Sequence, residues 1–433
     1  MEEVSGKQQP AVSDVLPQEL YEKTLDCVHC GLCLTSCPTY IATGRENSSP
    51  RGRIYLMRGV AEGNVALGPL LKEEAFLCLG CRACETACPA GVEYGSMLEL
   101  TRETLTVSGQ NSGLAARIER FLLRHVVAHR ARLRVAIAIL GFAQTLRVDR
   151  VAQALLPRSI GGRIAVAPRV PKASERTPIP GFSPALGERR GCVALFTGCI
   201  MSEVFGQVHR ATIRTLTANG FDVVVPETQG CCGALCAHAG DVESARGLAR
   251  HNAGAFADAA SQRSQPFDAL IVNSAGCGAA MREAENWIGE TGHEYASLVR
   301  DVCEFLDEVG LRPPSASLSA TVCYDDPCHL IHAQRVVDAP RRLLTSVDGI
   351  ELLGHDEASA CCGAAGIYNL THAEMSERVL KRKLDSLERV DPDWIATGNP
   401  GCATQIASGV RARRMRARVV HPVELLAAAY EGC

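Results

Sequence analysis

Two short cysteine runs of identical spacing constrain this chain more than any other feature. One extends from Cys27 to Pro38 and the other from Cys78 to Pro89, and both read C-x2-C-x2-C-x3-C-P. This spacing is typical of [4Fe–4S] clusters: three thiolates on a tight coil grip three corners of a cube, and the trailing Cys-Pro directs the fourth thiolate to the other cluster. The predicted ligands of one cluster are Cys27, Cys30, Cys33 and Cys88, and those of the second are Cys78, Cys81, Cys84 and Cys37.

Two other interpretations of these runs explain less. A zinc site needs only four ligands and typically pairs two C-x2-C units, so it leaves the third Cys and the Cys-Pro of each run without a role. A disulfide framework is poorer still, because cysteines two residues apart in such a series are badly placed to pair. The runs therefore favour two iron–sulfur clusters.

Composition is that of a soluble globular protein that keeps its thiols reduced. The 433 residues include 21 Cys, and residues 1–17 are polar and mildly acidic, unlike a secretory signal. Many cysteines without an export signal indicate thiols kept for metal, which favours the cytoplasm. A net charge of −3 argues against nucleic acid as a general partner. The longest apolar run, residues 135–143, is less than half of the ~20 residues that cross a bilayer, so membrane contact is expected to be peripheral at most.

Residues 13–108 are expected to form a mainly helical domain around the two cysteine runs. The runs are separated by 40 residues, and the segments 54–60 and 70–76 have the apolar spacing of helices. The segment from Ser49 to Arg53 is expected to begin a connecting helix. Its two arginines, Arg51 and Arg53, either face the negative charge of a cluster or a partner, or simply lie at an exposed helix start.

Residues 109–188 are predicted to be a basic helical connector that ends in a proline-rich linker. Two acidic residues, Glu119 and Asp149, stand against the arginines of residues 114–156, which are Arg117, Arg120, Arg124, Arg130, Arg132, Arg134, Arg147 and Arg150. A basic amphipathic helix can lie on an anionic membrane, dock on an acidic partner subunit, or remain solvated. We favour solvation or docking on a partner.

An internal repeat occupies the rest of the chain, with one copy over residues 189–312 and the other over 318–433. In each copy an apolar β-type run precedes a single Cys, a Cys-Cys-Gly follows after 31 or 32 residues, and a last Cys follows another apolar run. Strands that alternate with helices predict parallel sheets, which would collect the cysteines at the carboxyl ends of the strands. These cysteines are Cys199, Cys231, Cys232 and Cys277 in the first copy and Cys328, Cys361, Cys362 and Cys402 in the second. The predicted fold class is therefore a multidomain α+β protein with a helical two-cluster domain and a pair of α/β repeats.

Four cysteines at matched spacing, repeated, indicate a third metal or redox site. A single buried Cys is usually a small core residue, and this is our interpretation of Cys192, Cys236, Cys303 and Cys323, with Cys433 at the terminus. The repeated sets could hold a further iron–sulfur cluster, zinc or a redox-active thiol pair. These alternatives stay open at this level.

The Cys-Cys-Gly copies resemble the cysteine-rich domain of heterodisulfide reductase-type subunits. That family's fuller pattern ends in C-x2-C, whereas Ser274 and Asn399 stand at the penultimate Cys here, so a five-Cys cluster is in doubt. The whole arrangement resembles electron-transfer subunits of the glycolate oxidase type, a group that includes the iron–sulfur subunit of anaerobic glycerol-3-phosphate dehydrogenase and lactate-utilisation proteins. The segments most similar to glycolate oxidase iron–sulfur subunits are residues 27–40, 50–56, 275–278, 332–334 and 361–368.

The resemblance implies an electron relay and no bond-making by this chain. A partner FAD subunit would oxidise glycolate to glyoxylate, and the clusters would pass the electrons one at a time to a quinone or another acceptor. The sequence fits this division, because it contains no strand–G-x-G-x-x-G–helix fingerprint and no evident flavin-binding signature. Equivalent subunits that act on lactate or glycerol 3-phosphate are alternatives, as is a stand-alone disulfide or quinone reductase of the heterodisulfide reductase type.

Overall fold

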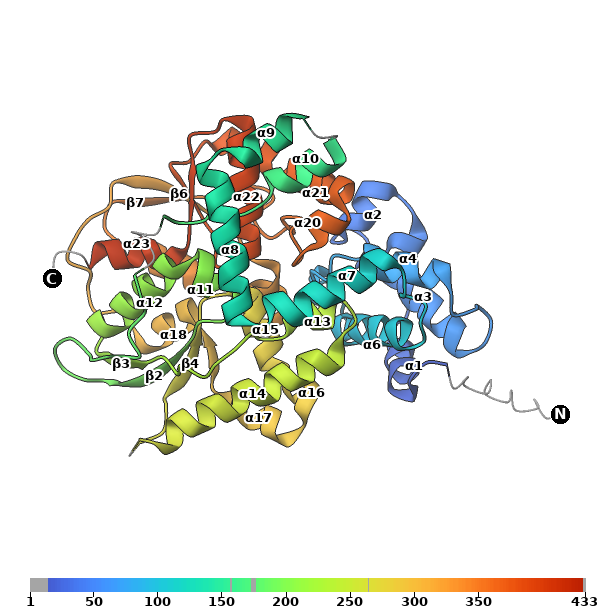
Figure 1. Ribbon diagram of the computed structural model, residues 1–433, viewed down its shortest axis with the longest axis horizontal. Coiled ribbons are helices and arrows are strands. Elements are labelled where there is room, and N and C mark those ends of the chain that lie inside the picture. Colours follow the sequence, from blue (N-terminus) through green and yellow to red (C-terminus); the bar gives the residue numbers. More distant parts are fainter. Residues whose placement is uncertain (1–14, 156–157, 173–176, 264, 431–433) are drawn as a thin grey trace. The chain divides into compact units, whose positions relative to one another are not determined.

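The computed structural model describes residues 15–155, 158–172, 177–263 and 265–430 (Figure 1). The chain divides into two compact units. One consists of Met1–Arg117 with His238–Gly240, and the other of Ile118–Ala237 with Asp241–Cys433. The domain limits expected from the sequence, 13–108, 109–188, 189–312 and 318–433, stay predictions.

The first unit is helical in its described part. Prolines begin three of its helices, where the missing N–H costs no hydrogen bond, and the Ser49 hydroxyl accepts the Gly52 N–H to cap the helix that follows. Its elements are α1 (Gln18–Leu25), α2 (Pro38–Thr43), η1 (Glu46–Ser48), α3 (Pro50–Ala61), α4 (Pro69–Leu77), α5 (Ala83–Thr86) and α6 (Tyr94–Val107). Fully buried Leu20, Met57 and Met97 join α1, α3 and α6 in one core.

Two small sheets form the centre of the second unit. The first has the order β1-β3-β2-β4-β5, and the second has the order β7-β6-β8-β9. All neighbours are parallel except β1 and β3. The strands are β1 (Phe182–Ser183), β2 (Gly191–Phe196), β3 (Phe221–Val224), β4 (Ala269–Val272), β5 (Val299–Asp301), β6 (Ala320–Tyr324), β7 (Ile350–Leu353), β8 (Trp394–Ala396) and β9 (Arg418–Val420). The first strand of each copy is thus central, as expected for a repeated βαβ unit.

Helices connect these strands in both copies. In the first copy they are α11 (Ile200–Val204), α12 (Gly206–Ala218), α13 (Ala234–His238), α14 (Val242–Ser261), α15 (Ala275–Arg282), α16 (Glu285–Ile288), α17 (Glu290–Ser297) and α18 (Val302–Val309). In the second they are η4 (His329–Ala333), α19 (Ala339–Thr345), α20 (Tyr368–Thr371), α21 (Ala373–Val390), α22 (Pro400–Arg413) and α23 (Pro422–Ala429).

The two copies share a hydrophobic core. Val193 and Leu216 of the first copy and Val423 and Leu426 of the second belong to the same buried cluster. The last helix, α23, packs against α12 of the first copy. The repeats are therefore halves of one packed unit.

The basic segment after residue 109 is helical and packs onto both copies of the repeat. Its elements are α7 (Leu114–Leu122), η2 (Leu123–Val127), α8 (Arg130–Thr145), α9 (Val148–Leu155) and α10 (Arg158–Ala165). Arg124 is 2.8 Å from Asp241, and Arg134 is 3.4 Å from Glu203. Some of its arginines thus serve as intramolecular anchors, a role not anticipated from the sequence.

The architecture confirms the predicted α+β class, with a helical first part and two repeats containing parallel sheets. Four of the leftover cysteines, Cys192, Cys236, Cys303 and Cys323, are buried, and Cys433 lies outside the described residues. No helix in the described ranges is long and apolar enough to cross a membrane.

Candidate metal centres

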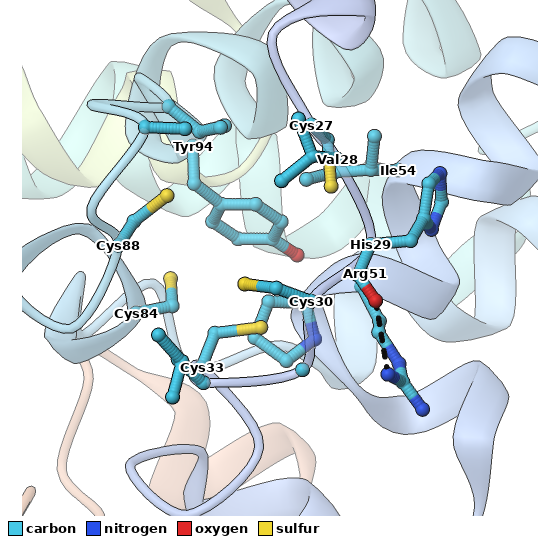
Figure 2. A pocket seen from close by; sticks show the side chains of 15 residues that line it. Cys27, Val28, His29, Cys30, Cys33, Arg51, Ile54, Cys84, Cys88 and Tyr94 are labelled. Atoms are coloured by element: carbon cyan, nitrogen blue, oxygen red, sulfur yellow. Dashed lines mark hydrogen bonds between the residues drawn. The ribbon is translucent and has the colours of Figure 1, made fainter.

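The first unit contains a hollow of about 440 Å³ around the first cysteine run. Its walls include the predicted ligands Cys27, Cys30, Cys33 and Cys88, and Cys84 also reaches it. Figure 2 shows their Sγ atoms directed into the space around the Tyr94 ring. Three thiols of the first run and the Cys88 thiol of the second run thus line one hollow.

Two residues with left-handed backbone shape the loop that carries these thiols. His29 has φ 55° and Gly31 has φ 86°. The positive φ of Gly31 favours glycine there, and a Cβ would also displace the Arg51 guanidinium, which lies 2.6 Å from its position. Arg51 in turn donates to the His29 carbonyl at 3.2 Å and to Glu46 Oε1 at 2.6 Å, which ties the loop to the start of α3 (Figure 2).

A second hollow, of about 290 Å³, surrounds the other four predicted ligands. These ligands are Cys37, Cys78, Cys81 and Cys84. Burial raises the pKa of Cys37 and raises that of Cys84 strongly. Such thiols need nearby positive charge, from the protein or from iron, in order to ionise.

Arg53 supplies positive charge beside the second hollow. Its side chain is fully buried and donates to the Glu74 carbonyl at 2.7 Å and to Thr39 Oγ1 at 3.1 Å. Thr39 Oγ1 lies 3.2 Å from Cys37 Sγ. Burial opposes the charge of Arg53, but the side chains of Tyr94, Cys78, Cys37 and Glu74 together raise its pKa above the ordinary value. Of the two arginines singled out in the sequence, Arg53 lines the second hollow, while Arg51 lines the first hollow and braces its loop.

Tyr94 forms a wall common to both hollows. Its side chain is buried, and its hydroxyl lies 3.7 Å from Cys78 Sγ. Pro50 and Cys84 also line both spaces. The two hollows therefore adjoin and share three lining residues.

The residues present fit two clusters better than two single ions. Eight thiols line two adjoining spaces, and backbone N–H groups point at sulfur, as from Gly80 to Cys78 Sγ at 3.4 Å. A cluster several atoms wide needs thiols spread around a cavity, which is the arrangement in both hollows. The assignment of each Cys to a cluster stays a prediction.

The first Cys-Cys-Gly copy brings its four thiols into one chain of contacts. Cys232 Sγ lies 3.3 Å from Cys277 Sγ, and Cys231 interacts with Cys199 and Cys232. The Gly233 N–H points at Cys231 Sγ at 3.5 Å. Hydrogen bonds from these neighbours lower the pKa of Cys231 well below the ordinary value.

The second copy repeats the arrangement with one change. Cys362 Sγ lies 3.2 Å from Cys402 Sγ, and the Gly363 N–H points at Cys361 Sγ at 3.4 Å. Here the pKa of Cys362 is the one held well below the ordinary value, by hydrogen bonds from Cys361 and Cys402 and, more weakly, by the charge of Lys383.

A buried ion pair between Lys383 and Asp325 accompanies the thiols of the second copy. Both side chains are about 1% exposed, and the Lys383 ammonium also donates to the Glu357 carbonyl at 2.7 Å. The His355 ring, fully buried, lies 3.8 Å from Asp325. No motif indicates this pair in the sequence, because Lys383 lies in a run of alternating charges that resembles a solvated helix face.

Asn399 links the thiol sites of the two copies. Its Oδ1 accepts the Gly276 N–H at 3.1 Å, next to Cys277, and its Nδ2 donates to Cys402 Sγ at 3.5 Å. In the sequence, Asn399 is notable only because it stands where the related pattern has its penultimate cysteine. The structure gives it contacts with both copies.

Comparison with known proteins follows the same division of the chain. A family model described as "4Fe-4S dicluster domain" matches residues 23–92, and one described as "Cysteine-rich domain" matches residues 193–282 and 322–407. The chain is therefore an iron–sulfur protein with an electron-transfer role, and its cofactors are iron–sulfur clusters.

Similar proteins show more specifically which family of iron–sulfur proteins this chain belongs to. The "Probable glycolate oxidase iron-sulfur subunit" of Bacillus subtilis (strain 168) is 35% identical over 419 residues, which cover 93% of each chain. The "Glycolate oxidase iron-sulfur subunit" of Escherichia coli (strain K12) is 31% identical over 413 residues, 94% of each chain. "Lactate utilization protein A" of Geobacillus kaustophilus (strain HTA426) is 29% identical over 242 residues, 54% of this chain and 98% of that one. The protein belongs to the family of glycolate oxidase iron–sulfur subunits, and as such it is an oxidoreductase subunit that works in a complex.

Proposed function

We propose that this chain is the electron-transfer subunit of a flavin-dependent glycolate oxidase, which converts glycolate to glyoxylate. The observation that carries the proposal is the pair of adjoining cysteine-lined hollows in a chain that is 35% identical to a probable glycolate oxidase subunit over nearly its full length. In this scheme a partner FAD subunit oxidises the substrate. A quinone or another acceptor receives the electrons, and the complex works in the cytoplasm or at the membrane surface.

The first unit would hold the two [4Fe–4S] clusters through its eight cysteines. Bound clusters supply one-electron transfer at potentials that charge, hydrogen bonds and burial tune. Cys27, Cys30, Cys33 and Cys88 would hold one, and Cys37, Cys78, Cys81 and Cys84 the other. Arg53 would offset part of the negative charge of the thiolates, and the Tyr94 ring would keep water from the space between the sites.

The eight cysteines of the two repeats would provide a third redox or metal centre. The four thiols of the first copy contact one another through Cys231 and Cys232, and Cys361, Cys362 and Cys402 do so in the second copy. In each copy one thiol has a strongly lowered pKa, and the thiolate is the form of cysteine that binds metal. A further iron–sulfur cluster, zinc and a redox thiol pair all use this form. Iron and zinc content will discriminate among them.

Lactate oxidation is the second candidate, favoured by the likeness of about half of this chain to a lactate-utilisation protein. The same architecture would then relay electrons from a different hydroxy acid. Only the substrate and the flavin subunit would differ.

The decisive experiment is anaerobic purification of the native complex, followed by EPR before and after addition of glycolate. We expect flavin to co-purify and glycolate to reduce the cluster signals, with an iron count that reveals any third cluster. The matched variants are Cys27→Ser, which should abolish one cluster signal of the first unit, and Cys231→Ser, which should leave both in place and remove only a third centre.

Other outcomes separate the alternatives. Clusters that stay oxidised with glycolate but are reduced by lactate or glycerol 3-phosphate would contradict the substrate and keep the relay. Absence of any flavoprotein partner would contradict the relay and favour a stand-alone reductase.

A further inference from the structure

Helix α8 is apolar on two opposite sides. Leu133 and Ile137 are buried against Val204, in a cluster that also contacts Cys199. On the other side Val135, Ile139, Phe142 and Leu146 are 58–67% exposed. Positions i, i+4, i+7 and i+11 form one stripe along a helix, and positions 133 and 137 fall on the reverse side. A helix with two apolar sides needs two apolar neighbours, and the first copy provides only one.

The next helix, α9, also has an exposed apolar face. Val148, Val151 and Leu155 of α9 are 52–79% exposed, again on one helix face. The apolar face of α8 and α9 therefore comprises seven large side chains, Val135, Ile139, Phe142, Leu146, Val148, Val151 and Leu155. An exposed apolar set of this extent marks an interaction surface.

Charge decides the kind of partner. Residues 130–155 contain five arginines and only one acidic residue, Asp149. Arg134 is anchored to Glu203, while Arg132 and Arg147 are exposed beside the stripe. The outward side of α8 carries aliphatic groups, one phenyl ring and arginine, and α8 contains no acidic residue. Apolar side chains beside arginines are what an interfacial helix presents to anionic lipid.

The position of α8 connects this face to the thiols. Because the inner stripe contacts Cys199 and the outer stripe lies on the far side of the same helix, the two are separated by about one helix diameter, roughly 10 Å. The helix lies across the surface beside α11 (Figure 1). A lipid surface on the outer stripe would thus bring the first thiol site close to an acceptor dissolved in the membrane.

We propose that the apolar face of α8 and α9 docks on an anionic lipid bilayer, with the first Cys-Cys-Gly site toward the membrane. The docking itself depends only on this face. Its role in delivering electrons to a membrane-dissolved quinone rests on the proposed function.

Vesicle flotation of the full-length protein in its native complex tests the docking. The probes are vesicles of equal parts phosphatidylglycerol and phosphatidylcholine, and vesicles of phosphatidylcholine alone. We expect binding to the anionic vesicles and loss of about fivefold in affinity for each of Arg132→Gln and Arg147→Gln. The double variant Ile139→Asp/Phe142→Asp should lose binding by about tenfold or more, because both side chains would enter the lipid. Val337→Asp is the matched control, since Val337 is a 48% exposed side chain of the same unit outside the face.

Two results would overturn the proposal. One is absence of wild-type flotation, and the other is flotation of the double variant as strong as that of Val337→Asp. If wild type does not float and the double variant instead loses its flavin partner, the face is a protein interface. Flotation does not depend on electron transfer. A negative flotation result would therefore contradict the lipid docking but not the proposed function. A failure of glycolate to reduce the clusters would contradict the proposed function but not the docking.

Discussion

The two Cys-Cys-Gly copies hold similar thiol sets against different backgrounds. Behind the first set, Asn252 of α14 donates to the Cys231 carbonyl at 2.8 Å. Behind the second, the matching position of α21 is Lys383, because Asn252 and Lys383 each lie seven residues after the residue that packs under the Cys-Cys glycine. One site is thus braced by a neutral amide and the other by a buried ammonium paired with Asp325.

The comparison distinguishes features that the fold of both copies requires from features that differ between the two thiol sites. Both copies keep the glycine with positive φ after the cysteine pair, Gly233 and Gly363, because the backbone must pass close to the following helix. The groups behind the thiols are free to change. A buried ion pair is weak evidence for added stability, so we interpret Lys383 as a charge that tunes the second thiol set.

Removal of the Lys383 charge should have the largest effect on the free energy of unfolding, because, in the described part of the two copies, only the second has a buried ion pair behind its thiols. Lys383→Met leaves the buried Asp325 carboxylate without its partner, which costs about 3–5 kcal/mol in the free energy of unfolding. Denaturant titration measures this loss. Burial raises the pKa of Asp325 even though Lys383 lowers it, and removal of Lys383 raises this pKa further. The loss should therefore be largest at alkaline pH and should shrink at lower pH as the carboxyl takes up a proton.

A charge-neutral double variant and a surface variant serve as controls. Asp325→Asn/Lys383→Met should recover much of the stability. Lys381→Met, at a 68% exposed side chain paired with Asp385, should change it by less than about 1 kcal/mol. Equal stability of the Lys383 and Lys381 variants would refute a buried, charged Lys383.

Acid should destabilise the first copy through His209. Its Nε2 pairs with the Thr197 carbonyl at 3.0 Å, and its Nδ1 faces the Asn273 amide at 3.0 Å, so only the neutral ring fits. Burial lowers the pKa of His209 from 6.5 to about 4. The unfolded chain therefore binds more protons between these values, and stability is lost as pH falls from 6.5 towards 4, by about 3 kcal/mol in total.

The variant His209→Gln should flatten this part of the curve of unfolding free energy against pH. His293→Gln should leave it in place, because the exposed His293 has a pKa raised by Glu285, the opposite direction. An unchanged acid slope in His209→Gln would contradict the assignment.

The glycine after each cysteine pair offers a matched test of backbone strain. Gly233→Ala and Gly363→Ala both force alanine to φ near +86°, at a cost of about 1–2 kcal/mol. A Cβ at Gly363 would also meet the Ser376 carbonyl at 2.6 Å, against 3.0 Å from Ala245 Cα at Gly233. We expect the larger loss for Gly363→Ala by thermal denaturation.

Gly247→Ala in α14 is the control for this pair. A Cβ there meets nothing within 4 Å, so the substitution should stabilise the helix slightly. A larger loss of thermal stability for Gly233→Ala than for Gly363→Ala would contradict this expectation and would show that the backbone of the second copy adjusts more easily to the added Cβ.

The smallest effect is expected at Asn399, where the copies meet. Asn399→Ala removes one hydrogen bond to Gly276 N–H and one to Cys402, a loss of about 1 kcal/mol. Ser274→Ala, at the corresponding position of the first copy, should cost less, because the Ser274 side chain caps no N–H of α15. Equal losses would argue against the bridging role of Asn399.

Local patterns predicted much of this molecule. The two cysteine runs, the helical first part and the repeat follow from spacing. Contacts across the chain were not predictable. Arg53 lies in an ordinary basic segment, and only folding buries it beside Cys37.

The sequence by itself determined which side chains can ligate metal and which segments form helices and strands, because spacing and periodicity act over a few residues. Only the tertiary structure decided that the repeats share one core, that Lys383 is buried behind Cys362 and Cys402, and that α8 retains an uncovered apolar side. Burial depends on which surfaces meet, and segments hundreds of residues apart contribute those surfaces. A charged sequence such as that of α21 looks the same whether a given lysine is solvated or buried. The role of Lys383 therefore becomes clear only when the residues packed around it are known.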